Sequence, residues 1–216
     1  MKTWDEVITG IEPVTGQNLA DSLRVANPTD VALCTAYATA ARGLVEQYCR
    51  IAIVRRTITM YMDSFIDGSQ RSGDPWWDGV RDGSIMDMYR TPNKIELPMP
   101  PLVSVTSVKA YDDNDVATTM LASTYVVDAA SRKQPGRVAV KRGNTWPAVI
   151  LRVVNGVEIV FVAGYADGLV PEEIRQAILL VGGKLFADRG DCGAECVEGC
   201  GAGPLLAAFK LLNPPN

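Results

Sequence analysis

The apolar residues of this chain change their spacing twice, and this change constrains the fold more than any single motif. Apolar positions follow a helical period over residues 15–50, alternate in short stretches over residues 54–165, and return to the helical period over residues 171–211. A period of two indicates strands with one buried face, whereas a period near 3.6 indicates amphipathic helices. The order predicts an α+β fold, in which N-terminal and C-terminal helices form a helical core around an inserted antiparallel β layer.

Two helices are expected before the first strand. The first covers Thr15–Val25, and the second begins at Asn27-Pro28, because Asn is a favoured N-cap and Pro fits the first helical position. The second helix should extend to about Arg50, with Cys34 and Cys49 as small core or half-buried residues. Its apolar stripe is expected at Leu33, Tyr37, Ala40, Leu44 and Tyr48, widened by Ala36, Ala41 and Val45.

The middle of the chain alternates as strands do. Strands are expected at Val54–Met62, Lys94–Leu97, Leu102–Tyr111, Thr124–Asp128, Gly136–Val140 and Val157–Tyr165. The acidic segment at residues 112–115 lacks the ligand spacing of a calcium loop, so a turn is expected there. A long loop, residues 67–92, separates the first two strands. Its Trp76 and Trp77 are expected either to cap the sheet or to contact a partner.

The C-terminal part is expected to be helical again. Pro171, Glu172 and Glu173 indicate a helix start, because Pro fits the first turn and carboxylates favour the positive end of the dipole. Gly182 and Gly183 lie inside this helix and predict a close helix–helix crossing or a bend. A short final helix is expected from Pro204, so that helices cover about 171–211 and a flexible tail follows at 212–216. Residues 1–216 are therefore expected to form a single domain.

Composition excludes several classes of function. The net charge is 21 − 25 = −4 and no basic cluster occurs, which argues against binding to nucleic-acid phosphates. Histidine is absent, which removes Ser-His-Asp and Cys-His nucleophiles and every zinc site that uses His. The first ten residues have no hydrophobic signal region, and no apolar run reaches the ~20 residues of a membrane span. The sequence thus favours a protein without catalytic, cofactor-binding or metal-binding residues, which starts in the cytosol and binds no membrane.

Three cysteines in a glycine-rich segment leave one chemical alternative open. Cys192, Cys196 and Cys200 follow one another at intervals of four residues. One hypothesis is a metal- or cluster-dependent enzyme, although three thiolates fall one short of a closed zinc site. The interleaved glycines disfavour a helix that would align the thiols. The preferred interpretation is a hinge before the last helix, with cysteines that are incidental or form an occasional disulfide.

A series of short motifs resembles a known family. In chain order these are "IELPMPPLVSVTSVKAYDDND", "STYVVDAASRKQPGRVAV", "WPAV", "VEIVFVAGYADG" and "VPEEIRQAILLVGGKLFADR", preceded by the helices "NLADSLRV" and "ALCTAYATAARGLVEQYCR". The series covers most of residues 15–190 and resembles the head–tail connector (adaptor, head-completion) proteins of tailed bacteriophages and phage-like gene transfer agents. The order of the pieces is more specific than any single piece.

The resemblance implies a structural virion protein and no reaction. Family members form a homo-oligomeric ring, commonly of twelve subunits, which joins the portal at the capsid vertex to a stopper or tail-terminator protein. DNA passes through the ring without sequence-specific binding. The resemblance therefore implies a place at the head–tail junction of a particle that is assembled in the bacterial host cytoplasm.

Partner contacts cannot be carried over from the family, because the 67–92 loop and the cysteine segment depart from its pattern. From the residues themselves, contacts are expected at Trp76 and Trp77 and at the C-terminal Phe209, Leu211 and Leu212. A third possibility is a monomeric binding module with an exposed aromatic loop.

Overall fold

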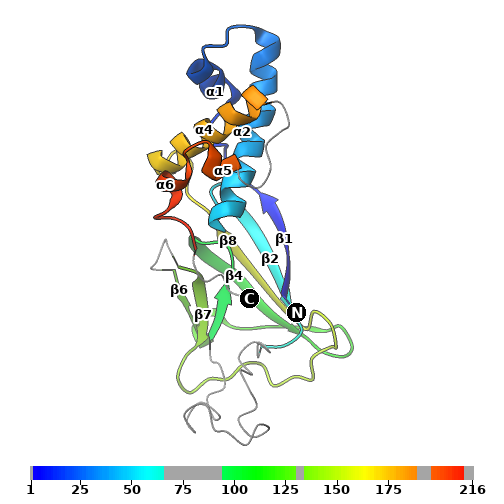
Figure 1. The fold of residues 1–216 in the computed structure, drawn as a ribbon. Helices are drawn as coiled ribbons and strands as arrows, with labels where there is room; N and C mark the ends of the chain where they lie inside the picture. Colours follow the sequence, from blue (N-terminus) through cyan, green and yellow to red (C-terminus); the bar gives the residue numbers. More distant parts are fainter. Residues whose placement is uncertain (1, 66–93, 130–133, 189–195, 212–216) are drawn as a thin grey trace, which may run out of the picture.

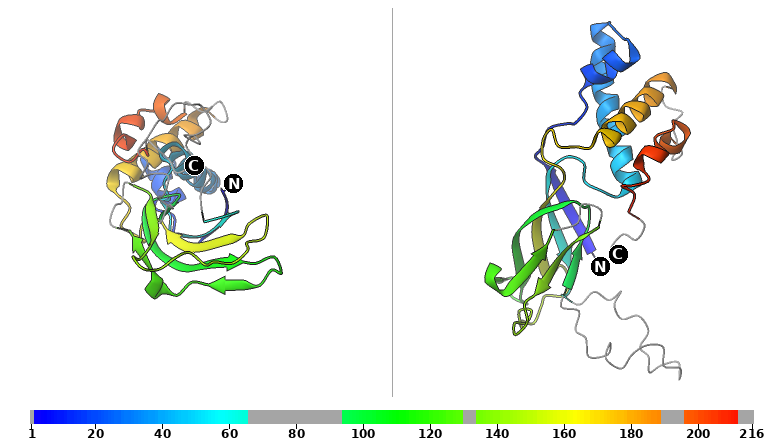
Figure 2. Two further views of the ribbon diagram at one scale, coloured as in Figure 1. Left: turned by 90° about the horizontal axis from the view of Figure 1, so that it is seen from below. Right: turned by 90° about the vertical axis from the view of Figure 1, so that its left-hand side faces the viewer.

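The protein is elongated, with its helices at one end and its strands at the other (Figure 1). The computed structural model describes residues 2–65, 94–129, 134–188 and 196–211. The right-hand view of Figure 2 shows the same division between a helical end and a β end. The α+β class expected from the alternation of periods is confirmed. None of the described helices is long and apolar enough to span a bilayer.

The β end contains two antiparallel sheets. The larger sheet has the order β1-β2-β8-β4-β5 and the smaller one the order β3-β7-β6. The larger sheet consists of β1 (Lys2–Ile8), β2 (Arg56–Met62), β8 (Val157–Ala163), β4 (Leu102–Tyr111) and β5 (Ala117–Thr119). The smaller sheet consists of β3 (Lys94–Leu97), β7 (Gly136–Val140) and β6 (Tyr125–Asp128), which follows a 3₁₀ turn, η2 (Ala122–Thr124).

The helical end is built from segments that are far apart in the sequence. It contains α1 (Gly16–Leu23), α2 (Pro28–Cys49), α4 (Glu172–Asp188), α5 (Cys196–Gly199) and α6 (Gly203–Leu206). α1 and α4 both pack on α2, so the chain returns to its starting helices after the strands. The helix starts follow from local chemistry, because Asn27 Oδ1 accepts a hydrogen bond from Thr29 N at 3.1 Å and Pro28 occupies the first turn.

Each end has its own apolar core. The helical cluster joins α1, α2, α4, α5 and α6 through buried residues that include Leu19, Val45, Ile178 and Leu206. The sheet cluster joins the facing sides of both sheets through Met60, Phe161, Leu97 and Val138, among others. Strands β2 and β8 alternate strictly between buried and half-buried positions, as a sheet with one covered face requires.

The buried face of α2 differs from the predicted stripe. Leu33 and Ala40 are exposed, whereas the residues buried in the helical cluster are Cys34, Ala38, Ala41, Val45 and Cys49. The stripe is therefore wrong at Leu33, Ala36 and Ala40. Ala41 and Val45 are buried as predicted, Tyr37, Leu44 and Tyr48 pack half-buried against the cluster, and the burial of both cysteines is confirmed. Small residues are selected because α4 crosses closely: a Cβ on Gly182 would lie 3.0 Å from Leu19 Cδ2 and 3.7 Å from Ala41 Cβ. The close crossing predicted from Gly182 is confirmed.

The C-terminal segment does not behave as the predicted hinge over residues 196–206. Cys196, Val197, Ala202 and Leu206 are buried in the helical cluster, so this part of the segment is packed against the other helices. Gly201 lies in the turn between α5 and α6, where it adopts a positive φ of 79°. The final helix is also shorter than predicted, since α6 ends at Leu206. Residues 189–195, with Cys192, lie outside the described residues.

Candidate interaction surface

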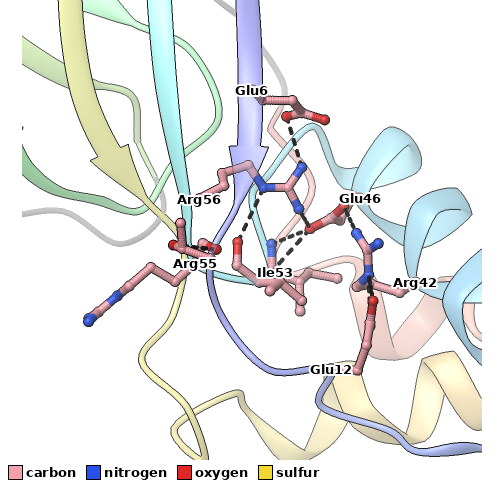
Figure 3. Close-up of polar contacts among 9 residues, drawn as sticks. Glu6, Glu12, Arg42, Glu46, Ile53, Arg55 and Arg56 are labelled. Atoms are coloured by element: carbon pink, nitrogen blue, oxygen red, sulfur yellow. Dashed lines mark hydrogen bonds and ion pairs between the residues drawn. The ribbon is translucent and has the colours of Figure 1, made fainter.

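A chain of paired charges, buried at its centre, connects the two ends of the protein. We call Glu6, Glu12, Arg42, Glu46 and Arg56 the junction cluster (Figure 3). Glu6 lies on β1, Arg56 begins β2, Arg42 and Glu46 lie one turn apart on α2, and Glu12 lies between β1 and α1. Arg42, Glu46 and Arg56 are buried. The cluster therefore sits where the helical end meets the larger sheet.

Glu46 is the centre of this cluster. Its Oε1 accepts hydrogen bonds from Arg56 Nη2 and from the backbone N–H of Ile53 at 2.7 Å, while its Oε2 accepts one from Arg42 Nη1. Arg42 Nε is shared by the two carboxylate oxygens of Glu12, at 3.0 and 2.9 Å. Arg56 Nη1 donates to Glu6 Oε2 at 2.9 Å. Arg55, the neighbour of Arg56, points away from the cluster (Figure 3).

The junction cluster has the properties of a structural joint. Burial disfavours the Arg56 cation, yet the hydrogen bonds and charges of Glu46 and Glu6 raise its pKa overall. Each arginine is held between two carboxylates, so neither guanidinium is available to a ligand. The cluster fixes the helical end to the sheet and offers no group for catalysis.

A second polar group lies on the other face of the larger sheet. Glu158 Oε1 accepts a hydrogen bond from Lys109 Nζ at 2.8 Å, and its Oε2 accepts one from Tyr111 Oη at 2.9 Å. The Arg152 guanidinium lies 4.3 Å from the centre of the Tyr111 ring. Burial raises the pKa of Glu158, but the bonds to Lys109 and Tyr111 outweigh it and lower the pKa overall. These contacts bridge β4 and β8 and therefore stabilise the sheet.

The pocket at the junction is small. It has a volume of about 230 Å³ and is lined by residues that include Ile11, Glu12, Tyr165, Asp167 and Arg175. Sites for drug-sized ligands usually span roughly 300–1,000 Å³ and are mostly apolar. One of the lining carboxylates is already used, because Asp167 Oδ1 accepts a hydrogen bond from Ile11 N at 3.0 Å. The pocket therefore supplies little chemistry for a cofactor.

Of the three cysteines in the enzyme hypothesis, Cys196 and Cys200 lie among the described residues, and they do not supply a pair of free thiolates there. Cys196 is engaged in a disulfide bond, so it offers no thiolate to a metal. Cys200 is a half-buried free thiol, and Cys34 and Cys49 are buried in the helical cluster. Within the described ranges, no group of three His, Cys, Asp or Glu side chains is arranged to hold a metal ion.

The partner residues expected from the sequence fall into two groups. Trp76, Trp77 and Leu212 lie outside the described residues. Phe209 is half-buried against the helical cluster, and the backbone N–H of Leu211 donates to Cys49 O at 3.0 Å. Lys210 Nζ lies 4.1 Å from the centre of the Tyr48 ring. The chain up to Leu211 is thus held against the end of α2.

The exposed apolar residues at the two edges of the larger sheet were not predicted. On and after β1 these are Trp4, Val7, Ile8 and Ile11; near β5 they are Val116, Leu121, Ile150, Val153 and Val154. The sequence of β1 shows no period of two in its apolar residues, because Val7 and Ile8 are adjacent. β5 has three residues, too few for a periodic signal. The available signal for an exposed apolar strand was the large side chain of Trp4 next to the charged Asp5 and Glu6.

Comparisons with known proteins identify a shared fold, whereas comparisons of sequence identify no family. No family model and no curated protein matches the sequence. The structure is similar to a chain from the neck of an empty gene transfer agent (GTA) particle with C6 symmetry, with 20% identity and a TM-score of 0.65. That match covers 92% of this chain and 94% of the other.

Two further solved structures show the same fold. A chain from the virion of a native GTA particle has 19% identity and a TM-score of 0.68, over 97% of this chain and 96% of the other. A chain from the neck of a native GTA particle with C12 symmetry has 20% identity and a TM-score of 0.62, over 96% of both chains. The likeness covers both the helical end and the β end, so the whole architecture is shared.

Proposed function

We propose that this protein is the adaptor subunit of an oligomeric ring at the head–tail junction of a phage-like particle. The ring joins the portal at the capsid vertex to a stopper or tail-terminator protein, and DNA passes through its channel. The protein has no enzymatic role in this proposal. The observation that carries it is the similarity, over more than nine-tenths of both chains, to chains from the neck and virion of GTA particles.

The motif series supports the same proposal independently of the fold comparison. Its pieces map onto β3, β4, β6, β7, β8 and α4 of the structure, in the order of the adaptor family. The charged groups of the described residues also support a structural role, because the junction cluster and the Glu158 group hold helices and strands together. A structural subunit needs such joints and needs no reactive constellation.

The symmetry of the compared particles supports a ring. The neck structures have C6 and C12 symmetry, and twelve copies around an axis would be compatible with both. The net charge of −4 suits a subunit around a DNA channel, because a strongly basic lining would retain the passing phosphates. A continuous Lys and Arg lining in the assembled ring would contradict this part of the proposal.

Electron microscopy of the protein mixed with the portal protein of its own particle tests the proposal. We expect a ring of repeated subunits seated on the portal, with a central channel. The protein alone, across a range of concentrations, serves as the control for assembly without the portal. A monomer that binds no portal under any of these conditions would contradict the proposal and favour a monomeric binding module.

The C-terminal residues provide a sharper test of portal docking. Removing residues 212–216 leaves every described contact of the helical end in place, including the hydrogen bond from Leu211 N to Cys49 O. We propose that Leu212 and its neighbours contact the portal, so the truncated protein should keep its stability and lose portal attachment. Normal attachment by the truncated protein would refute this assignment.

A further inference from the structure

Strand β1 forms one edge of the larger sheet, beside β2 (Figure 1). Every side chain from Thr3 to Ile8 is exposed, on both faces of the strand. β2, one position further into the sheet, is by contrast buried at alternate residues. An edge strand that is bare on both faces and carries Trp and Ile is a surface that soluble monomers normally protect.

The inner face of the sheet continues onto β1, where its two large apolar side chains, Trp4 and Ile8, are exposed. Trp4 lies opposite Met60 and Ile8 opposite Arg56 in the antiparallel register, so their side chains share a face with those residues. Met60 and Arg56 are 0% and 2% exposed, whereas Trp4 and Ile8 are each 46% exposed. On this face of β1, Glu6 lies between Trp4 and Ile8 and pairs with Arg56 of the junction cluster, whereas Trp4 and Ile8 remain exposed.

The opposite edge of the same sheet is apolar as well. β5 is exposed throughout, and Val116 and Leu121 flank it at 60% and 70% exposure. The connection before β8 adds Val153 and Val154, and the bridge between Asp112 and Leu151 places it beside the end of β4. Each molecule therefore carries two different apolar edges, at opposite ends of one five-stranded sheet.

Two different apolar surfaces on one chain fit a head-to-tail contact between copies. Such a heterologous contact closes into a ring when the rotation between subunits fits, whereas a two-fold dimer would use one surface twice. The charges near the two edges are of opposite sign, as such a contact favours. Asp5 is exposed on β1, and Lys141 and Arg142 are exposed after β7. Lys141 N donates a hydrogen bond to Thr124 O, which places this basic pair near Leu121.

We propose that β1 of one subunit packs against the β5 edge of a second copy of this chain, with Trp4 as the anchor. The contact is carried by side chains, because β1 and β5 run in the same direction and β5 has only three residues for a parallel ladder. Trp is enriched among the residues that dominate binding energy at protein interfaces. This inference rests on the proposed ring and adds which surfaces form its subunit contacts.

Site-specific photocrosslinking tests the contact in the full-length protein. A photoreactive side chain in place of Trp4 should crosslink, in the assembled ring, to residues 116–121 or 149–154 of a neighbouring copy, as mapped by mass spectrometry of the crosslinked peptides. A ring that forms but crosslinks from position 4 to any other segment or protein would overturn the inference and leave the proposed function standing. Failure to assemble at all would contradict both.

A matched pair of substitutions measures the same contact. Trp4→Ser should weaken subunit association about 30-fold or more, as loss of an interface anchor does. The control Leu180→Ser changes an apolar residue of similar exposure, 42%, on α4 at the helical end, and should change association by less than about threefold. Thermal unfolding checks that both variants fold. Equal effects of the two variants, or no effect of Trp4→Ser, would overturn the inference.

Discussion

Glu46 of α2 and Arg56 of β2 form a buried ion pair that joins the helical end of the protein to its larger sheet. The same carboxylate also accepts a hydrogen bond from the backbone N–H of Ile53, in the segment between the helix and the strand. One side chain thus fixes the end of the helix, the connection and the beginning of the strand. This arrangement makes Glu46 the most consequential charge of the described structure.

Replacing Glu46 by Gln should destabilise the protein by about 3–5 kcal/mol, because Arg56 and Arg42 would remain buried beside a neutral amide. Urea unfolding followed by circular dichroism measures the change in the free energy of unfolding. Glu172→Gln is the matched control, since it removes one carboxylate from an exposed pair with Arg175 and should cost less than about 1 kcal/mol. Similar losses in both variants would contradict the structural role of the cluster.

The charge of Glu158 should stabilise the protein in a pH-dependent way. The pKa of Glu158 is lowered in the folded protein from its ordinary value of 4.5. The ionised carboxylate therefore contributes its full stabilisation above pH 4.5, and this stabilisation is lost as the pH falls through the lowered pKa. Glu158→Gln should cost roughly 1–2 kcal/mol at neutral pH, and the difference from the unchanged protein should shrink below about pH 4.5.

Urea unfolding at neutral pH and in steps below the ordinary pKa checks this expectation. Tyr111→Phe is the companion variant, because it removes one of the two hydrogen bonds to Glu158 and keeps the pair with Lys109. Its loss should be smaller than that of Glu158→Gln. A difference between Glu158→Gln and the unchanged protein that stays constant with pH would contradict the pairing.

Two helical glycines should respond to substitution in opposite directions. Gly43→Ala should stabilise the protein by about 0.5–1 kcal/mol, because a Cβ there meets nothing within 4 Å and Ala has the higher helix propensity. Gly182→Val should destabilise it by about 1–3 kcal/mol, because its Cβ alone would come to 3.0 Å from Leu19 Cδ2. Thermal unfolding of both variants measures the two shifts; a neutral Gly182→Val would show that the packing of α4 against Leu19 of α1 is loose.

The free thiols should differ in reactivity. Burial raises the pKa of Cys49 to about 11, an effect that the nearby Lys210 only partly opposes, and burial together with Asp30 raises the pKa of Cys34. Since the thiolate is the reactive form, a thiol reagent near neutral pH should modify the half-buried Cys200 well before Cys34 or Cys49. Mass spectrometry of digested protein gives the order, and urea should abolish the difference. Early modification of Cys49 would contradict its packing.

Local signals in the sequence were sufficient for most individual elements. Lys94–Leu97, Leu102–Tyr111 and Gly136–Val140 have the bounds that their alternation predicts, because each strand buries one face. Asn27 and Pro28 place the start of α2 for a similarly local reason, namely the unpaired N–H groups of a first helical turn. The turn at 112–115 is confirmed, with Asp112 Oδ1 accepting hydrogen bonds from Asn114 N and Val116 N.

The tertiary structure decided what depends on neighbours from distant parts of the chain. The buried face of α2 is set by the helices that pack on it, α1 and α4, which leave Ala38 buried and the larger Leu33 exposed. The edge strand β1 has no period of its own, and its pairing with β2, some fifty residues later, defines it. Likewise Glu46 and Arg56 look like ordinary charges in the sequence, and only the fold buries them as an ion pair. The sequence by itself determined the long helices and most strands, but not β1 or β5, because the signals it carries lie within a few residues. Only the folded chain determined the joint between its two ends and its exposed edges, because these arise from contacts across long sequence separations.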